Sequence, residues 1–84
     1  MHIMFSTYVL WSPSLRQTYV GSTQDVPERL RRHNASHSRS TRRGVPWTLI
    51  HADAFATRAE AVARERYYKT GHGRIELWRR LGLV

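Results

Sequence analysis

The sequence predicts an α+β fold in which helices pack against a small three-stranded sheet, either antiparallel or mixed. Three observations predict this class. Two runs rich in β-branched and aromatic residues flank a proline-containing turn, a third such run follows Pro46, and helix-start signals come after the second and third runs. The expected order is therefore strand, strand, helix, strand, helix, helix. With 84 residues, we expect one domain over residues 1–84.

The first two strands form a predicted hairpin. Residues 4–11 are a β-branched, aromatic and apolar run, residues 12–14 read Ser-Pro-Ser, and residues 18–23 resume the strand pattern. After Pro46, residues 47–55 alternate imperfectly between apolar and polar side chains, which indicates the third strand.

The first helix is expected over residues 26–34. Asp25 is followed three residues later by Glu28, the spacing of a capping box, and Pro27 lies in the first turn. The polar and basic stretch at residues 36–44 is rich in turn-forming residues and is predicted to be a loop.

Two further helices follow the third strand. Thr57 and Glu60 repeat the capping spacing, and the helix that they open should run through about Lys69 and end at Gly71. A short last helix is expected over residues 74–81. Its apolar stripe consists of Leu77, Trp78 and Leu81.

The charge balance predicts a polyanionic partner. The chain has 14 Lys plus Arg against 6 Asp plus Glu, a net charge of +8 with neutral histidine. Thirteen of the 14 cations are arginine, whose planar guanidinium suits bidentate recognition of phosphate. The apolar content of 40% is too high for a disordered basic tail. A chain of this length is unlikely to enclose a deep cavity, so we expect function on an open face.

The composition excludes several classes of protein. The chain has no cysteine, which rules out a disulfide framework, a thiolate zinc site and a cysteine nucleophile. It has no apolar run of about 18 residues and no signal-peptide pattern at its start. We therefore expect a cytoplasmic protein without membrane binding.

Glu65 is the carboxylate left without a structural role. Asp53 lies late in the third strand, and the other acids lie at helix starts, where the helix dipole favours them. On a helix, Glu65 lies at the edge of the apolar stripe, where a carboxylate needs a cationic partner. Two interpretations are open: a salt bridge to one of the 13 arginines, or a ligand for a divalent metal ion.

Two residue pairs are candidates for chemistry. Arg29 and His33 lie four residues apart and so share one helix face, which fits either a solvated basic surface or a phosphate clamp beside a proton acceptor or donor. Tyr8 and Tyr19 lie eleven residues apart across the hairpin, a spacing compatible with one shared sheet face. Taken alone, two strand tyrosines are more typical of packing than of catalysis.

Five sequence elements belong together in one pattern. They are Tyr8 in TYVL, Tyr19 in YVGST, Arg29 in DVPERLRRHN, the loop threonine with Pro46 and Trp47, and Glu65 in EAVARE. In this order and spacing they resemble the GIY-YIG nuclease domain, over about residues 5–74, and most closely its small stand-alone bacterial members. The first motif has serine and threonine where the family name has glycine and isoleucine, and the second has Val20 for isoleucine.

The resemblance implies a metal-dependent endonuclease that hydrolyses DNA phosphodiester bonds, on nicked, branched or otherwise structured DNA such as repair intermediates. It implies one divalent ion, Mg²⁺ or Mn²⁺, held by Glu65 and completed by water and substrate oxygens, with no small-molecule cofactor. Arg29 would grip the scissile phosphate. Tyr8, Tyr19 and His33 would surround the attacking water, and each is a candidate for accepting its proton.

Gly21 should let the backbone approach closely where Tyr19 reaches the site. Five further arginines are expected to follow the nucleic-acid backbone. They are Arg31, Arg32, Arg39, Arg42 and Arg43. We expect a monomer or a weak homodimer.

One feature of several family members is missing, an asparagine after the metal-ligand glutamate. The chain has a single asparagine, Asn34, and the candidate replacements are a backbone group, Thr70 or His72. Two alternatives therefore stay open. One is a catalytically weak nucleic-acid-binding module of the same fold, and the other is a structural factor of a ribosome or protein assembly.

Overall fold

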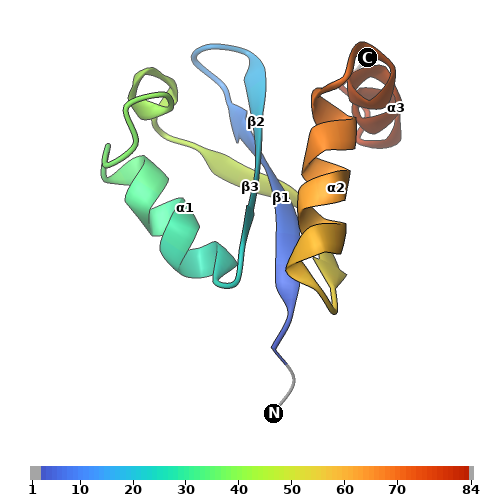
Figure 1. The fold of residues 1–84 in the computed structure, drawn as a ribbon. Helices are drawn as coiled ribbons and strands as arrows, with labels where there is room; N and C mark the ends of the chain where they lie inside the picture. The colour runs from blue at the N-terminus through green and yellow to red at the C-terminus, as the bar shows by residue number, and fades with distance from the viewer. Residues whose placement is uncertain (1–2, 84) are drawn as a thin grey trace.

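The computed structural model describes residues 3–83. The strands are β1 (Phe5–Ser12), β2 (Gln17–Thr23) and β3 (Thr48–Phe55), and the helices are α1 (Val26–Asn34), α2 (Arg58–Lys69) and α3 (Gly71–Arg80). The sheet is antiparallel with the order β2-β1-β3, so the first strand of the chain is the central one. α1 covers one face, α2 covers the other, and α3 packs on α2 (Figure 1). Each helix within residues 3–83 is too short or too polar to cross a membrane.

The predicted class and element order are confirmed, with one boundary displaced. α3 begins at Gly71 rather than near Arg74, because Thr70 both ends α2 and starts α3. The Thr70 hydroxyl donates to the carbonyl oxygen of Tyr67 at 2.7 Å and accepts from the backbone N–H of Gly73 at 3.0 Å. A Cβ on Gly73 would lie 1.9 Å from that same carbonyl oxygen. The corner between the two helices is therefore tightly closed.

β1 contributes to two cores because its side chains alternate between the faces of the sheet. On the α1 face the buried apolar residues are Tyr8, Leu10 and Trp47. On the α2 face they are Val9, Val20, Tyr68 and Leu77. Full burial of a side chain such as Leu10 contributes about 1.5–3 kcal/mol. The central strand is thus the part of the chain that ties both layers of helices together.

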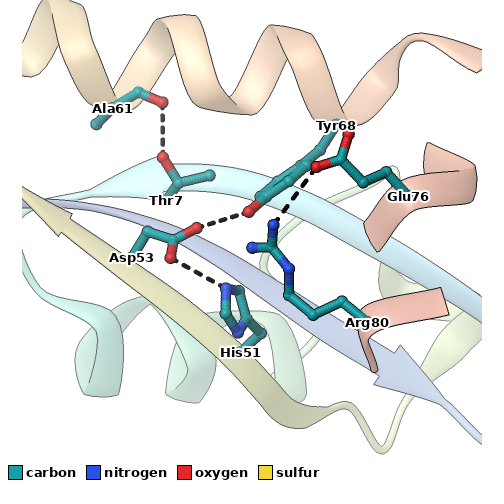
Figure 2. A network of polar contacts seen from close by, with 7 residues as sticks. All are labelled: Thr7, His51, Asp53, Ala61, Tyr68, Glu76 and Arg80. Atoms are coloured by element: carbon teal, nitrogen blue, oxygen red, sulfur yellow. Dashed lines mark hydrogen bonds and ion pairs between the residues drawn. The ribbon is translucent and has the colours of Figure 1, made fainter. Parts of the chain in front are cut away.

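Polar contacts fix the position of α2 on the sheet (Figure 2). The hydroxyl of Tyr68 donates to Oδ2 of Asp53 on β3 at 2.7 Å, and Oδ1 of Asp53 lies 3.1 Å from Nε2 of His51. The hydroxyl of Thr7 on β1 donates to the carbonyl oxygen of Ala61 at 2.7 Å. These contacts hold α2 against the central strand β1 and against β3. They therefore determine where the other side chains of α2 lie.

Candidate active site

The two hairpin tyrosines lie on the same face of the sheet, toward α1. Tyr8 pairs with Gly21, and Leu10 pairs with Tyr19, so the tyrosines are diagonal neighbours across β1 and β2. Their ring centroids are 6.3 Å apart. The expectation of one shared face is confirmed.

Gly21 makes room for Tyr8. A Cβ at Gly21 would lie 2.5 Å from the hydroxyl oxygen of Tyr8, so the phenol ring lies directly over the backbone of β2. The prediction that this close approach serves Tyr19 is wrong, because Gly21 is directly opposite Tyr8 in the register. The Tyr8 hydroxyl thus lies over an edge strand of the sheet and is buried, since Tyr8 is 1% exposed.

α1 brings Arg29 and His33 to these tyrosines. Asp25 caps the helix by accepting a hydrogen bond from the backbone N–H of Glu28 at 3.1 Å. Leu30 packs against the core on this face. His33 follows it along the helix and is 2% exposed. The alternative in which His33 is an ordinary surface histidine is therefore excluded.

His33 is held between Tyr8 and Thr41. Its Nε2 lies 2.9 Å from the hydroxyl oxygen of Tyr8, and its Nδ1 lies 2.7 Å from Oγ1 of Thr41. Burial, together with the positive charge of Arg29, lowers the pKa of His33, so the ring is neutral at pH 7 and has one donor and one acceptor nitrogen. Burial raises the pKa of Tyr8 to about 12, so Tyr8 keeps its proton. When Nδ1–H donates to Thr41, Nε2 is left to accept from the Tyr8 hydroxyl.

Glu65 belongs to α2, which contacts β2 and covers the face of the sheet opposite α1 (Figure 1). Its negative charge is among the causes that raise the pKa of Tyr8, after burial and Tyr19. Its Oε2 lies 2.6 Å from Nζ of Lys69, and this ammonium lies 6.0 Å from the ring centroid of Tyr19. The predicted salt bridge to an arginine is wrong, because the partner is the lysine one helical turn away. The Glu65 side chain is still 21% exposed.

A cleft of about 280 Å³ opens where α1 meets β2. It is lined by Tyr19, Arg29, Arg32, His33, His37 and Ser38. Arg32, predicted to contact the nucleic-acid backbone, thus lies beside Arg29. The two guanidinium groups from α1 make this cleft suited to an anion.

The other predicted backbone-binding arginines fall into two groups. A hollow of about 600 Å³ on the 36–44 loop is lined by Arg39, Ser40, Arg42 and Arg43. Arg31 instead donates to both carboxylate oxygens of Glu28, at 2.8 and 2.9 Å. Arg31 lines neither the cleft beside α1 nor the loop hollow. Because its guanidinium is already paired with Glu28, it is the least suited of the five predicted arginines to contact a phosphate.

Comparison with known proteins agrees with this arrangement. A family model described as the GIY-YIG catalytic domain matches residues 4–79. The chain belongs to the GIY-YIG family. GIY-YIG domains form a family of nuclease domains.

Several proteins resemble this GIY-YIG domain. A UPF0213 protein of Haloquadratum walsbyi is 42% identical over 53 residues, 62% of this chain and 60% of the relative. A UPF0213 protein of Bacillus licheniformis is 36% identical over 52 residues, 61% of this chain and 54% of the relative. The solution NMR structure of a UPF0213 protein from Bacillus halodurans has a TM-score of 0.54 and 26% identity, covering 88% of this chain and 81% of that one. The sequence matches thus span somewhat over half the length of these curated relatives.

The GIY-YIG site offers one carboxylate for a metal ion. Within residues 3–83, no three His, Asp or Glu side chains lie close enough together to hold an ion. The ion pair with Lys69 uses Oε2 of Glu65 and leaves Oε1 for a metal. A single carboxylate with water and phosphate oxygens fits Mg²⁺, which keeps several of its waters.

One member of the site, Lys69, is not identified by the sequence analysis. The Glu–Lys spacing of four on a helix is a signal that could have identified it. Thr41 is the loop threonine of the sequence pattern, but its contact with His33 depends on the path of the loop and has no local signal. Asn34 has a structural role: its side-chain amide bonds the backbone N–H and C=O of Trp47 at 2.6 and 3.0 Å. Of the candidate replacements for the missing asparagine, Thr70 is occupied by the helix caps.

Proposed function

We propose that the protein is a metal-dependent endonuclease that hydrolyses phosphodiester bonds in nicked, branched or otherwise structured DNA. The observation that carries this proposal is that Tyr19, Arg29 and His33 line one cleft, and that the hydroxyl of Tyr8 lies 2.9 Å from Nε2 of His33. Glu65 is close enough to Tyr8 for its charge to raise the pKa of Tyr8. Phosphodiester hydrolysis needs an activated water, neutralisation of the phosphoryl charge and stabilisation of the leaving oxygen.

Arg29 and Arg32 supply the charge for the scissile phosphate. Both line the cleft, and Arg29 is close enough to the tyrosine pair for its charge to lower the pKa of Tyr8, against the larger effect of burial. A guanidinium can bind two phosphate oxygens at once and hold them as charge grows in the transition state. One Mg²⁺ or Mn²⁺ at Glu65 would supply Lewis-acid stabilisation of the phosphoryl and leaving oxygens.

The hydrogen bonds support a path for the proton of the attacking water. A free Tyr8 phenolate is disfavoured, since the pKa of Tyr8 is raised to about 12 by burial. Neutral His33 lies 2.9 Å from the Tyr8 hydroxyl and can accept its proton. As Tyr8 gives this proton to His33, its oxygen takes the proton from water. Tyr8 and His33 thus act in series. Of the three candidates for accepting the proton of the attacking water, this proposal keeps Tyr8 and His33 and leaves out Tyr19.

The test is cleavage of labelled single-stranded, duplex, nicked, flapped and branched DNA, with Mg²⁺ or Mn²⁺ and with EDTA. We expect metal-dependent cleavage of at least one structured substrate, and a loss of about 10²–10³ in rate for Arg29→Ala or Glu65→Gln. Arg66→Gln is the matched control, because Arg66 is exposed and next to Glu65 on α2. Wild-type protein that cuts none of these substrates, or Glu65→Gln at the wild-type rate, would disprove the proposal.

One observation favours the alternative of a catalytically weak binding module of the same fold. The ion pair at 2.6 Å partly neutralises Glu65, which weakens its attraction for a divalent cation. In this alternative, DNA binds equally well with Mg²⁺ or EDTA and is not cut. The substrate panel distinguishes the two functions, since binding and cleavage are measured on the same DNA.

A further inference from the structure

A second basic cleft lies across Tyr19 from the first. It has a volume of about 340 Å³ and opens between β2 and the corner that joins α2 to α3. It is lined by Gln17, Thr18, Tyr19, Val20, Tyr68, Lys69 and Arg74. Tyr19 lines both clefts, so the two adjoin at this residue.

Arg74 is exposed at the second cleft and lies over the ring of Trp78. Its guanidinium lies 4.9 Å from the ring centroid of Trp78, and the indole N–H of Trp78 donates to Oγ1 of Thr18 at 3.2 Å. Within residues 3–83, no acid forms an ion pair with Arg74. A stacked guanidinium keeps its in-plane N–H donors available. The N–H donors of Arg74 are therefore available to bind an anionic group of a ligand.

Lys69 connects this cleft to the candidate metal ligand. Its ammonium has three donors, and the contact with Glu65 uses one of them. The Lys69 side chain is 51% exposed. Among residues 3–83, no acid lines the second cleft, so Lys69 and Arg74 give it a positive potential.

We propose that the cleft formed by Lys69 and Arg74 binds a phosphodiester group of the substrate strand next to the one that is cleaved. This inference rests on the proposed function, because it takes the first cleft as the place of the scissile phosphate. The occupant is a backbone phosphate, and a free inorganic phosphate has the same chemistry. Binding here would set the direction in which the strand leaves the site and would not read its bases.

The test combines Arg74→Gln with DNA in which one phosphate is replaced by a neutral methylphosphonate. Binding is measured by fluorescence anisotropy in EDTA, so that no cleavage occurs. We expect the methylphosphonate at one flanking position to weaken binding to wild-type protein and to have little further effect on Arg74→Gln. The variant should also reduce the slope of log affinity against log salt by about 0.7–0.9, the value for one phosphate contact.

Arg79→Gln is the matched control, because Arg79 is an exposed arginine five residues further along the same helix. It removes the same charge and should leave the response to the methylphosphonate as in wild type. Arg74→Lys keeps the charge and should keep most of the salt slope. Circular dichroism checks the fold, and Lys69→Gln, which removes the other cation of the cleft, serves if Arg74→Gln does not fold.

Three outcomes separate the explanations. If Arg74→Gln and Arg79→Gln respond alike at every methylphosphonate position, the inference is overturned whatever the cleavage assay gives. If inorganic phosphate binds wild-type protein and Arg74→Gln equally, while DNA binding depends on Arg74, the occupant is the nucleic-acid backbone as proposed. If Arg74 responds as expected but wild-type protein cuts no DNA, the cleft stands and the proposed nuclease function fails.

Discussion

The absence of a side chain at Gly21 allows the hydroxyl of Tyr8 to lie where it does. Any Cβ at this position would meet the phenol within 3 Å, and Tyr8 is 1% exposed, so the ring has little space to move. The glycine of the second motif therefore acts on the tyrosine of the first. The two motifs are one structural unit, joined by strand register.

Substituting Gly21 by alanine should displace Tyr8 from His33. We expect Gly21→Ala to destabilise the fold by about 1–3 kcal/mol through overpacking and to reduce cleavage more than its stability loss explains. Urea unfolding and single-turnover cleavage measure the two effects. Gly71→Ala is the control, since nothing lies within 4 Å of its added Cβ. Equal behaviour of the two variants would mean that Tyr8 tolerates the extra carbon.

Buried His33 should make the stability depend on pH. Burial places its folded pKa below the unfolded value of 6.5, so the unfolded chain takes up the proton first as the pH falls. We expect the free energy of unfolding to decrease as the pH drops below about 6.5 and to level off below the folded pKa. His33→Gln should lose this part of the pH dependence. Urea unfolding of both proteins at pH 7 and pH 5 checks it, and identical pH dependence would contradict it.

At the scale of elements, the 36–44 loop completes a site that helix α1 begins. Thr41 precedes the short 3₁₀ helix Arg42–Gly44, its hydroxyl binds His33, and its carbonyl oxygen accepts from the indole of Trp47 at 2.7 Å. Thr41 is 1% exposed. The loop that carries the outer arginines is thus anchored through the same residue that orients the histidine.

Removing the Thr41 hydroxyl should leave Nδ1 of His33 buried without a partner. We expect Thr41→Val to cost about 1–3 kcal/mol in the free energy of unfolding and to change the ratio of His33 tautomers. Nitrogen-15 NMR of the imidazole reports the tautomer directly. Thr41→Ser keeps the hydroxyl and should restore both the tautomer and the pH profile of cleavage. A valine variant with the wild-type tautomer would show that Tyr8 alone fixes the ring.

At the scale of the whole molecule, six arginines of a chain with a net charge of +8 line three hollows. They lie in the first cleft, the loop hollow and the second cleft, while Arg31 is already paired with Glu28. If about six phosphates are contacted, affinity for DNA should fall about a thousandfold between 50 and 200 mM salt. Anisotropy titrations over this range measure the slope. A flat response would show that these cations do not follow a backbone.

Much of this arrangement could be predicted from the sequence, and the exceptions have a common cause. Local signals sufficed for the helix caps at Asp25 and Thr57. The spacing of Tyr8 and Tyr19 was compatible with one shared face, but the register that makes them diagonal neighbours comes from the structure. The burial of His33 could not be predicted from the sequence. α1 has few apolar residues, and the polar ring of His33 occupies a buried position on this helix. Contacts such as that of Thr41 depend on how distant segments meet, which no local pattern encodes.

The cap at Thr70, which α2 and α3 share, also affects where the chain tolerates inserted residues. Lys69 and Arg74 belong to different helices, and a closed corner of a few residues separates them. Adding one residue there would leave each helix able to form, yet it would rotate α3 relative to α2 and pull the two cations apart. The exposed turn at residues 13–16 meets no such restriction. Insertions and fusions should therefore be accepted at the tip of the hairpin and rejected at the corner.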